Sequence, residues 1–248
     1  MYLTVRGLVI RVTRYNDTDA LLTVLTENSG KLTVKARGLC RKNSPLTAPC
    51  QLLAFSEFAL FEYRDMYTVN EAHAIELFLA LRKDLQKLSL GTYFAQVSDV
   101  ISQEDIPNPE VLSLTLNCLY ALTKLQISET LVKAVFELRI ACLAGYEPDL
   151  DACYHCGNTA PDRFNITQGR LECSSCRRGD SDDIRMPISC GSLDSMRYIV
   201  ACNSKKLFSF TIHDTTVMEL AYATEGYLTT QLERGFSALD FYKTLLIP

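Results

Sequence analysis

The hydrophobic pattern of the first 75 residues predicts five short β-strands, because apolar and β-branched runs alternate with turn signals. The run Lys31–Arg37 alternates most clearly, with Leu32, Val34 and Ala36 on one face and polar residues on the other. The expected strands span Tyr2–Tyr15, Asp19–Thr26, Lys31–Arg37, Phe55–Tyr63 and Met66–Ile75. Five strands in so short a segment suit a small closed barrel such as an OB-fold. An SH3-like barrel or an open meander fits nearly as well.

From residue 76 the apolar spacing changes to three and four residues, which predicts helices. Asn108 followed by Pro109 is typical of a helix start. Ser128 is expected to cap the next helix, and Gly145 to end it. A short helix is expected at residues 192–201 and a longer one at 215–233, which residues 236–246 could continue after Gly235. The pattern therefore indicates a helical domain after the barrel.

Four of the ten cysteines carry the sharpest local signal. Cys153 and Cys156 form one Cys-x-x-Cys pair, and Cys173 and Cys176 form a second pair sixteen residues later. This spacing is typical of a four-thiolate zinc site, in which two tight turns offer four sulfurs to one tetrahedral ion. Two disulfides or a redox pair are the alternatives. His155 lies between two of the cysteines and could replace one ligand, although an exposed side chain is the simpler interpretation. A closed four-sulfur site leaves no open position for catalysis, so the zinc is expected to be structural.

Together these patterns predict a multidomain α+β protein. Residues 1–75 are expected to form an OB-fold β-barrel, and residues 76–248 an α-helical domain. The four-cysteine zinc finger, at about residues 150–186, is expected as an insertion in the helical domain. Arg177 and Arg178 adjoin the last cysteine, but nearby aspartates offset the arginines of this segment, which favours an architectural role.

Charge is segregated along the chain and changes the functional interpretation. The formal net charge is −4, which taken alone argues against a nucleic-acid partner. Residues 1–50 nevertheless hold eight Lys/Arg against three Asp/Glu, a net charge of +5, whereas residues 51–150 hold seven against fourteen. A basic module is therefore attached to an acidic remainder, which suggests contact with nucleic acid or another anionic partner.

The basic residues of this module are the candidate DNA contacts. The polar face of Lys31–Arg37 leads into a Gly/Pro-bounded loop, expected to be flexible, and such a surface can follow a phosphate backbone. Cations from the first strand could join it if they face the same way. The predicted DNA-binding residues are Arg6, Arg11, Arg14, Lys31, Lys35, Arg37, Arg41 and Lys42. The alternative is that lysines on an exposed strand only discourage pairing at a sheet edge. Most aromatic residues of the barrel are expected in its core, although some of them could stack on bases. The candidates are Tyr2, Tyr15, Phe55, Phe58, Phe61, Tyr63 and Tyr67.

Other function classes find little support in the sequence. None of the three histidines accompanies a nucleophile in a motif, and no G-x-S-x-G, H-E-x-x-H, Walker A or G-x-G-x-x-G pattern occurs. An enzyme is therefore not expected. No apolar run is long enough to span a bilayer, and the first residues do not resemble a signal peptide. We expect an intracellular protein.

Several motifs resemble the RecO family of DNA repair proteins. The central ones are Phe136–Arg139, Gly145–Leu150 and Cys153–Gly157. Weaker matches are Lys35–Gly38 followed by Arg41–Lys42, and Leu232–Arg234 followed by Ser237–Leu239. The order of basic barrel, helical bundle, finger and short terminal helices also resembles that family along the whole chain.

The resemblance implies a recombination mediator of the RecF pathway. Such a protein binds single- and double-stranded DNA, anneals complementary strands and acts with RecR. It helps RecA to load onto DNA coated by single-strand binding protein, in the cytoplasm at the nucleoid. In the family the helical domain binds the acidic tail of single-strand binding protein, and Lys124 and Lys133 are candidate contacts here. A zinc-containing adaptor that acts through protein partners is the main alternative, and a nuclease or thiol oxidoreductase is the other.

Overall fold

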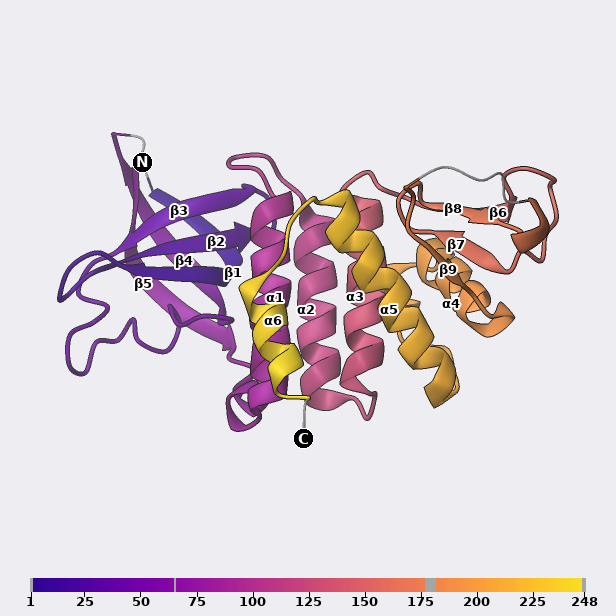
Figure 1. The fold of residues 1–248 in the computed structure, drawn as a ribbon. Coiled ribbons are helices and arrows are strands. Elements are labelled where there is room, and N and C mark those ends of the chain that lie inside the picture. Colours follow the sequence, from indigo (N-terminus) through magenta and orange to yellow (C-terminus); the bar gives the residue numbers. More distant parts are fainter. Residues whose placement is uncertain (1, 65, 177–181, 247–248) are drawn as a thin grey trace. The chain divides into compact units, whose positions relative to one another are not determined.

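The computed structural model describes residues 2–64, 66–176 and 182–246, and it divides the chain into two compact units (Figure 1). Unit 1 comprises Met1–Leu125 and Phe236–Pro248, and unit 2 comprises Gln126–Gly235. The change from strands to helices falls near the expected domain boundary after residue 75. The two compact units instead divide the chain after residues 125 and 235, so the boundary at residue 75 stays a prediction.

Unit 1 begins with a closed five-stranded barrel in the order β1-β2-β3-β5-β4, which is OB-like. Closure decides against the open meander. The strands are β1 (Tyr2–Arg14), β2 (Ala20–Thr26), β3 (Lys31–Ala36), β4 (Phe55–Tyr63) and β5 (Met66–Glu76). They lie within one or two residues of the predicted strands, because alternation and turn residues both mark their ends.

The long loop between β3 and β4 is part of the barrel core. Leu39, Leu46 and Cys50 of this loop are buried among the inward-facing side chains of the strands. Backbone hydrogen bonds also join Val9 to Leu53 and Ala54 at the end of the loop. The expectation of a flexible basic loop is therefore wrong, because its apolar residues are buried while Arg41 and Lys42 remain exposed.

Three helices complete unit 1, namely α1 (Leu85–Ile101), α2 (Pro109–Lys124) and α6 (Ser237–Thr244). A 3-10 turn, η1 (Leu79–Lys83), precedes α1. The apolar spacing predicted helix from Leu77 onward, but α1 begins at Leu85. Asp84 caps it by accepting hydrogen bonds from the backbone N–H groups of Gln86 and Lys87, which fixes the start of the helix. The predicted start of α2 at Asn108–Pro109 is confirmed.

Unit 2 contains the paired helices α3 (Glu129–Leu143) and α5 (Asp214–Gln231). Ser128 caps α3 as predicted, and Gly145 follows the helix with a φ of 90°, a conformation that favours glycine. In the sequence, the finger and α4 (Cys190–Ala201) come between α3 and α5. A short 3-10 turn, η3 (Ser204–Lys206), follows α4.

The finger is built on a small four-stranded sheet in the order β6-β8-β7-β9. Its strands are β6 (Asp149–Cys153), β7 (Arg163–Asn165), β8 (Arg170–Glu172) and β9 (Arg185–Pro187), and the 3-10 turn η2 (Ser174–Cys176) follows β8. The sequence did not indicate this sheet, since strands of three residues are too short to show a period. None of the helices in the described ranges combines the length and apolar character that crossing a membrane requires.

Candidate nucleic-acid interface and metal centre

The cations of β3 point outward from the barrel, as the alternation predicts. Leu32, Val34 and Ala36 are buried, whereas Lys31 and Lys35 lie on the outer face. β3 pairs with β2 on one side and with β5 on the other. Because β5 pairs with β3 at Val34 and Lys35, Lys35 does not serve to protect a free sheet edge.

Two of the predicted DNA-binding residues are held by one carboxylate of α1. Lys31 Nζ lies 3.0 Å from Asp99 Oδ1 and 2.7 Å from the Asp99 carbonyl oxygen, and its side chain is only 15% exposed. Arg11 forms a longer ion pair of 3.4 Å with Asp99 and donates a hydrogen bond from Nε to Thr23 Oγ1. Lys31 therefore links the barrel to α1 through this ion pair, and its charge is little exposed to an external ligand.

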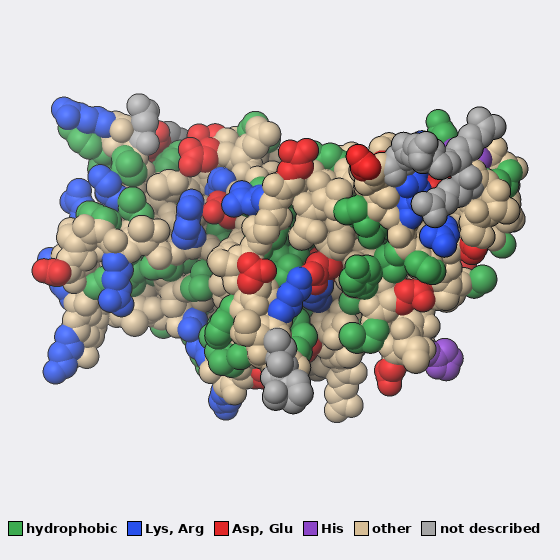
Figure 2. Space-filling model, viewed as in Figure 1, with side chains coloured by type: hydrophobic (Ala, Val, Ile, Leu, Met, Phe, Trp, Pro, Cys, Tyr) green, Lys and Arg blue, Asp and Glu red, His purple; other side chains and the backbone are tan. Residues whose placement is uncertain are grey.

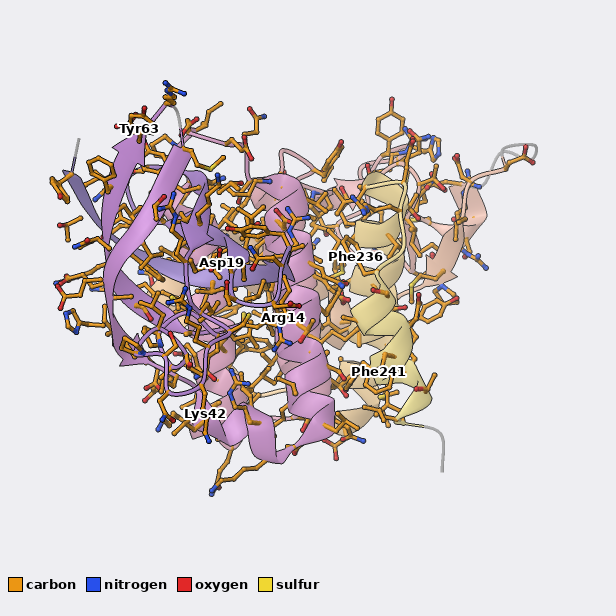
Figure 3. The ribbon with its side chains drawn as sticks, turned by 90° about the vertical axis from the view of Figure 1, so that its left-hand side faces the viewer. Arg14, Asp19, Lys42, Tyr63, Phe236 and Phe241 are labelled. Carbon is orange, nitrogen blue, oxygen red and sulfur yellow. The ribbon has the colours of Figure 1, made fainter. Side chains whose placement is uncertain are left out.

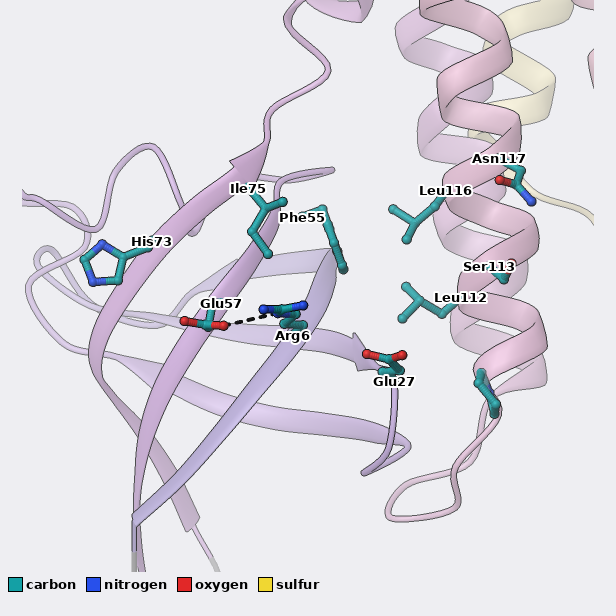
Figure 4. A pocket seen from close by; sticks show the side chains of 11 residues that line it. Arg6, Glu27, Phe55, Glu57, His73, Ile75, Leu112, Ser113, Leu116 and Asn117 are labelled. Carbon is teal, nitrogen blue, oxygen red and sulfur yellow. Dashed lines mark hydrogen bonds and ion pairs between the residues drawn. The ribbon is translucent and has the colours of Figure 1, made fainter. Parts of the chain in front are cut away.

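Arg6 is also engaged within unit 1. Its Nε lies 3.1 Å from Glu57 Oε2 on the neighbouring strand β4. The pair borders a pocket of about 670 Å³ between the outside of the barrel and α2, lined by apolar residues that include Phe55, Ile75 and Leu112 (Figure 4). The neighbouring carboxylate of Glu57 offsets the charge of Arg6, which makes Arg6 a weaker candidate for contact with phosphate.

The other five predicted residues, Arg14, Lys35, Arg37, Arg41 and Lys42, make no side-chain ion pair within the described ranges. Arg14, Arg37, Arg41 and Lys42 are exposed, and Lys35 is half-buried. Lys and Arg side chains are visible over the barrel strands in Figure 2. Lys42 lies far from Tyr63, toward the other end of the barrel (Figure 3). The available positive charge is therefore spread along the barrel.

Asp19, in the loop between β1 and β2, fixes the start of the basic loop. Its Oδ1 accepts a hydrogen bond of 2.7 Å from the backbone N–H of Gly38, directly after Arg37. That bond, followed by bonds from the side chains of Asn16 and Thr18, lowers the pKa of the Asp19 carboxyl to about 2. Gly38 has a φ of 70°, and the Arg41 side chain lies beside it. The carboxylate thus sets the path of the chain between Arg37 and Arg41.

Several aromatic residues expected in the core lie on the outside of the barrel. Tyr2, Phe61 and Tyr63 are 71%, 39% and 60% exposed, whereas Phe58 is buried. Strand alternation could have shown this. Phe61 and Tyr63 are two residues apart and share one face of the strand, whereas Phe58 is an odd number of residues away and lies on the opposite face. Sequence reasoning included these three among the residues that could stack, namely Tyr2, Phe61 and Tyr63, but it did not separate them from the core aromatics, because aromatic residues are more often buried.

The four cysteines of the finger come together as predicted. Their sulfur atoms all lie within 4.8 Å of one another, and Cys156 Sγ is 3.9 Å from Cys173 Sγ. Cys153 ends β6, Cys173 follows β8, and Cys176 lies in η2. The turn after the first pair closes with a hydrogen bond from the Gly157 N–H to the Cys153 carbonyl, and Gly157 has a φ of 72°. These sulfurs form one cluster that could hold a metal ion.

The geometry of this cluster fits a tetrahedral thiolate site. Zinc–sulfur bonds of about 2.3 Å place two ligands of a tetrahedron about 3.8 Å apart, close to the spacing of Cys156 and Cys173. That spacing excludes a disulfide between these two, which requires about 2.0 Å. Burial opposes ionisation of Cys153, but hydrogen bonds from backbone N–H groups, that of Cys156 foremost, lower the pKa of its thiol to about 6. The Asn158 side chain also donates to Cys173 Sγ at 3.3 Å.

A buried carboxylate stiffens the sheet beside the cysteines. Glu172 accepts hydrogen bonds from Asn165 Nδ2 at 2.9 Å and from Arg185 Nε at 2.8 Å. These partners lower its pKa against the opposing effect of burial. His155 is exposed, lies 3.9 Å from Glu172 and is outside the sulfur cluster. Arg177 and Arg178 lie outside the described residues.

Lys133, one of the two candidate contacts for the acidic tail, is buried inside unit 2. Its Nζ lies 2.8 Å from Glu137 Oε1 and 2.7 Å from Glu225 Oε2, and its side chain is 5% exposed. A lysine so enclosed cannot reach an external peptide, so this expectation is wrong. Lys124, in the last turn of α2, is exposed and remains a candidate.

Comparison with known proteins agrees with this architecture. A family model described as "Recombination protein O N terminal" matches residues 1–78, and one described as "Recombination protein O C terminal" matches residues 82–240. The DNA repair protein RecO of Acetivibrio thermocellus is 36% identical over 246 residues, which cover 98% of this chain and 97% of the relative. The RecO proteins of Alkaliphilus metalliredigens and Caldicellulosiruptor bescii are each 29% identical, covering 99% and 96% of this chain and 100% and 96% of those relatives. With both halves matched and a relative this similar along its whole length, the chain belongs to the RecO family of DNA repair proteins.

Proposed function

We propose that this protein is a recombination mediator of the RecF pathway that binds single- and double-stranded DNA through its barrel. It anneals complementary strands and, with RecR, promotes loading of RecA onto DNA coated by single-strand binding protein. It acts in the cytoplasm at the nucleoid, and it does so by binding rather than by catalysis. Family membership supports this role, and the positive charge of the barrel supplies a physical basis for it.

The observation that carries the proposal is the set of unpaired cations on a closed OB-like barrel. Lys35 and Arg37 project from the outer face at the end of β3, and Arg41 and Lys42 follow on the loop between β3 and β4. Cations that are not neutralised by carboxylates can replace the counterions of a phosphate backbone, which favours binding through release of those ions. Such contacts carry no base code, so binding independent of sequence is expected.

The cysteine cluster would hold one structural zinc ion through Cys153, Cys156, Cys173 and Cys176. Four thiolates suit zinc, and a fully occupied tetrahedron leaves no position for a substrate or water. The ion would stabilise the finger, in which three of the four strands have only three residues.

The ion pairs within unit 1 allow a sharp test of the DNA site. The triple variant Lys35→Gln/Arg37→Gln/Arg41→Gln should bind DNA more weakly and with a smaller dependence on salt. Each lost phosphate contact reduces the slope of log K against log salt by about 0.7 for single strands and about 0.9 for duplex. Fluorescence anisotropy of labelled DNA at several salt concentrations measures both quantities, and an annealing assay in the same buffer measures the activity.

Arg6→Gln is the matched control, because Arg6 is paired with Glu57 and its loss should hardly change the slope. Equal effects of Arg6→Gln and the triple variant would contradict the assignment of the site. Failure of the wild-type protein to bind DNA even at low salt would favour the alternative, a zinc-containing adaptor that acts through protein partners.

A further inference from the structure

Three exposed aromatic rings form a second, uncharged feature on the barrel. Along β4 the residues Ser56, Phe58 and Leu60 are buried, so Phe61 and Tyr63 do not belong to the core. Tyr2 pairs with Phe61 across β1 and β4, and their ring centroids are 5.3 Å apart. Tyr2, Phe61 and Tyr63 are together called the aromatic platform below.

Strand register places the platform in line with the free cations. Lys35 of β3 pairs with Thr68 of β5, Thr68 pairs with Phe61 of β4, and Phe61 pairs with Tyr2 of β1. One row of outward side chains thus crosses four strands, a span of about 14 Å at the usual strand spacing. The row lies in a groove of about 560 Å³, which Arg37 and Tyr63 also line.

Core packing does not account for these rings. The barrel interior is already filled by Phe58, Leu60 and the other buried residues, and Phe61 and Tyr63 alternate with those buried residues along β4. Clustered exposed apolar residues that border polar side chains are typical of a binding surface. The Arg64 guanidinium lies 5.1 Å from the centroid of the Tyr63 ring, so positive charge borders the platform at this end as well.

The combination of rings and cations matches the chemistry of an unpaired nucleic-acid strand. Aromatic rings stack on the faces of bases, and cations beside them contact the phosphates. In a duplex the base faces are covered by neighbouring base pairs, so the exposed rings of this groove can stack only on bases that are not paired.

We infer that the aromatic platform is a base-stacking site for single-stranded DNA, with Lys35, Arg37 and Arg64 holding the backbone beside it. This inference rests on the proposed DNA binding and extends it. The cations bind any phosphate backbone, whereas the rings give single strands an additional affinity that duplex DNA lacks. Stacking on the faces of bases does not depend on base identity, so the additional affinity is independent of sequence.

An abasic strand separates the two contributions, because it keeps the phosphates and lacks the bases. Binding of the full chain to an oligothymidine, to an abasic strand of equal length and to a duplex should be measured by anisotropy, with any tag at the C-terminal end. The wild-type protein should prefer the oligothymidine to the abasic strand. Tyr63→Leu and Tyr2→Leu/Phe61→Leu should each reduce that preference about fivefold or more, leaving affinity for the abasic strand and the duplex unchanged.

Two control variants keep the result specific. Tyr63→Phe retains the ring and should behave as wild type. Tyr120→Leu removes an exposed tyrosine from α2, away from the platform, and should also leave the preference unchanged. Since all of these side chains are exposed, the variants should fold, and unchanged thermal unfolding would verify that they do.

Each other outcome has a definite meaning. Equal wild-type affinity for oligothymidine and abasic strand, or equal losses for both in the ring variants, would overturn the stacking site while leaving phosphate binding intact. Absence of binding to every strand would refute the proposed DNA binding itself. If the ring variants bound all strands normally but lost binding to RecR, measured in parallel, the platform would be a protein contact and the inference would be wrong.

Discussion

Individual ion pairs decide which cations of the barrel are available to a ligand. Alternation along β3 correctly predicted which side chains face outward. It could not predict that Lys31 and Arg11 share Asp99, because that carboxylate lies more than 60 residues away in sequence, on a helix. Of the eight residues proposed as DNA contacts, the five that have no carboxylate partner among residues 2–64, 66–176 and 182–246 form the stronger set.

Asp19 gives a prediction about pH at the same scale. Its carboxyl has a lowered pKa, so ionised Asp19 stabilises the fold above about pH 4, and this contribution is lost as the pH falls toward about 2. Asp19→Asn should therefore lower the unfolding temperature at pH 7, and the difference from wild type should shrink when thermal unfolding is repeated near pH 3. Asp17→Asn, in the same exposed loop, is the control. A difference that stays constant over this pH range would exclude the proposed role of the charge.

At the scale of elements, the sequence predicted the strands and most helices. It did not predict which side chains of different elements form ion pairs with one another. The bounds of β4 agree with the prediction, and α2, α3 and α5 differ from it by one or two residues at most ends. The apolar spacing along α3, with Leu131, Val135 and Leu138, indicates a buried face, but it does not show that Lys133 and Glu137 are buried as well. Charged residues are rarely enclosed in a core, and this lysine is enclosed because it pairs with Glu137 on its own helix and with Glu225 on α5.

This enclosed ion pair predicts a large effect on stability. Lys133→Met should lower the free energy of unfolding by about 3 kcal/mol, because Glu137 is fully buried and would lose its counterion. Urea unfolding followed by circular dichroism measures the change. Lys124→Met, on an exposed surface, should change it by less than about 0.5 kcal/mol. Lys133→Met/Glu137→Leu should recover part of the loss, and a double variant less stable than Lys133→Met would argue against an uncompensated charge as the cause.

At the scale of the whole molecule, the metal site and the barrel belong to different compact units. Unit 2 contains the four cysteines, and unit 1 contains every predicted DNA-binding residue. The spacing of the cysteines was sufficient to predict the cluster, because two Cys-x-x-Cys turns impose much of its geometry. The division into units was not apparent from the sequence, since the helices of both units have similar apolar stripes.

Removal of the metal should therefore destabilise one unit selectively. Native mass spectrometry is expected to show one zinc ion per chain. A strong chelator or Cys156→Ser should lower the unfolding temperature of unit 2 by about 10 °C or more, since metal binding is coupled to folding. Hydrogen exchange resolved by peptide should show the loss in residues 150–176, with the barrel strands still protected. Cys190→Ser, outside the cluster, is the control, and full stability without bound metal would refute a structural ion.

Helix α6 has a consequence for the order in which the protein can fold during synthesis. Phe236, just before this helix, packs on Tyr93 with ring centroids 5.5 Å apart, and Gln96 of α1 accepts a hydrogen bond from the Ala238 N–H. The ribosome translates these residues after all of unit 2. Unit 1 therefore starts folding first but is completed last, and a nascent chain exposes the docking face of α1 until translation has passed residue 244, the end of α6. Chaperone contact with the nascent chain should be concentrated on that face.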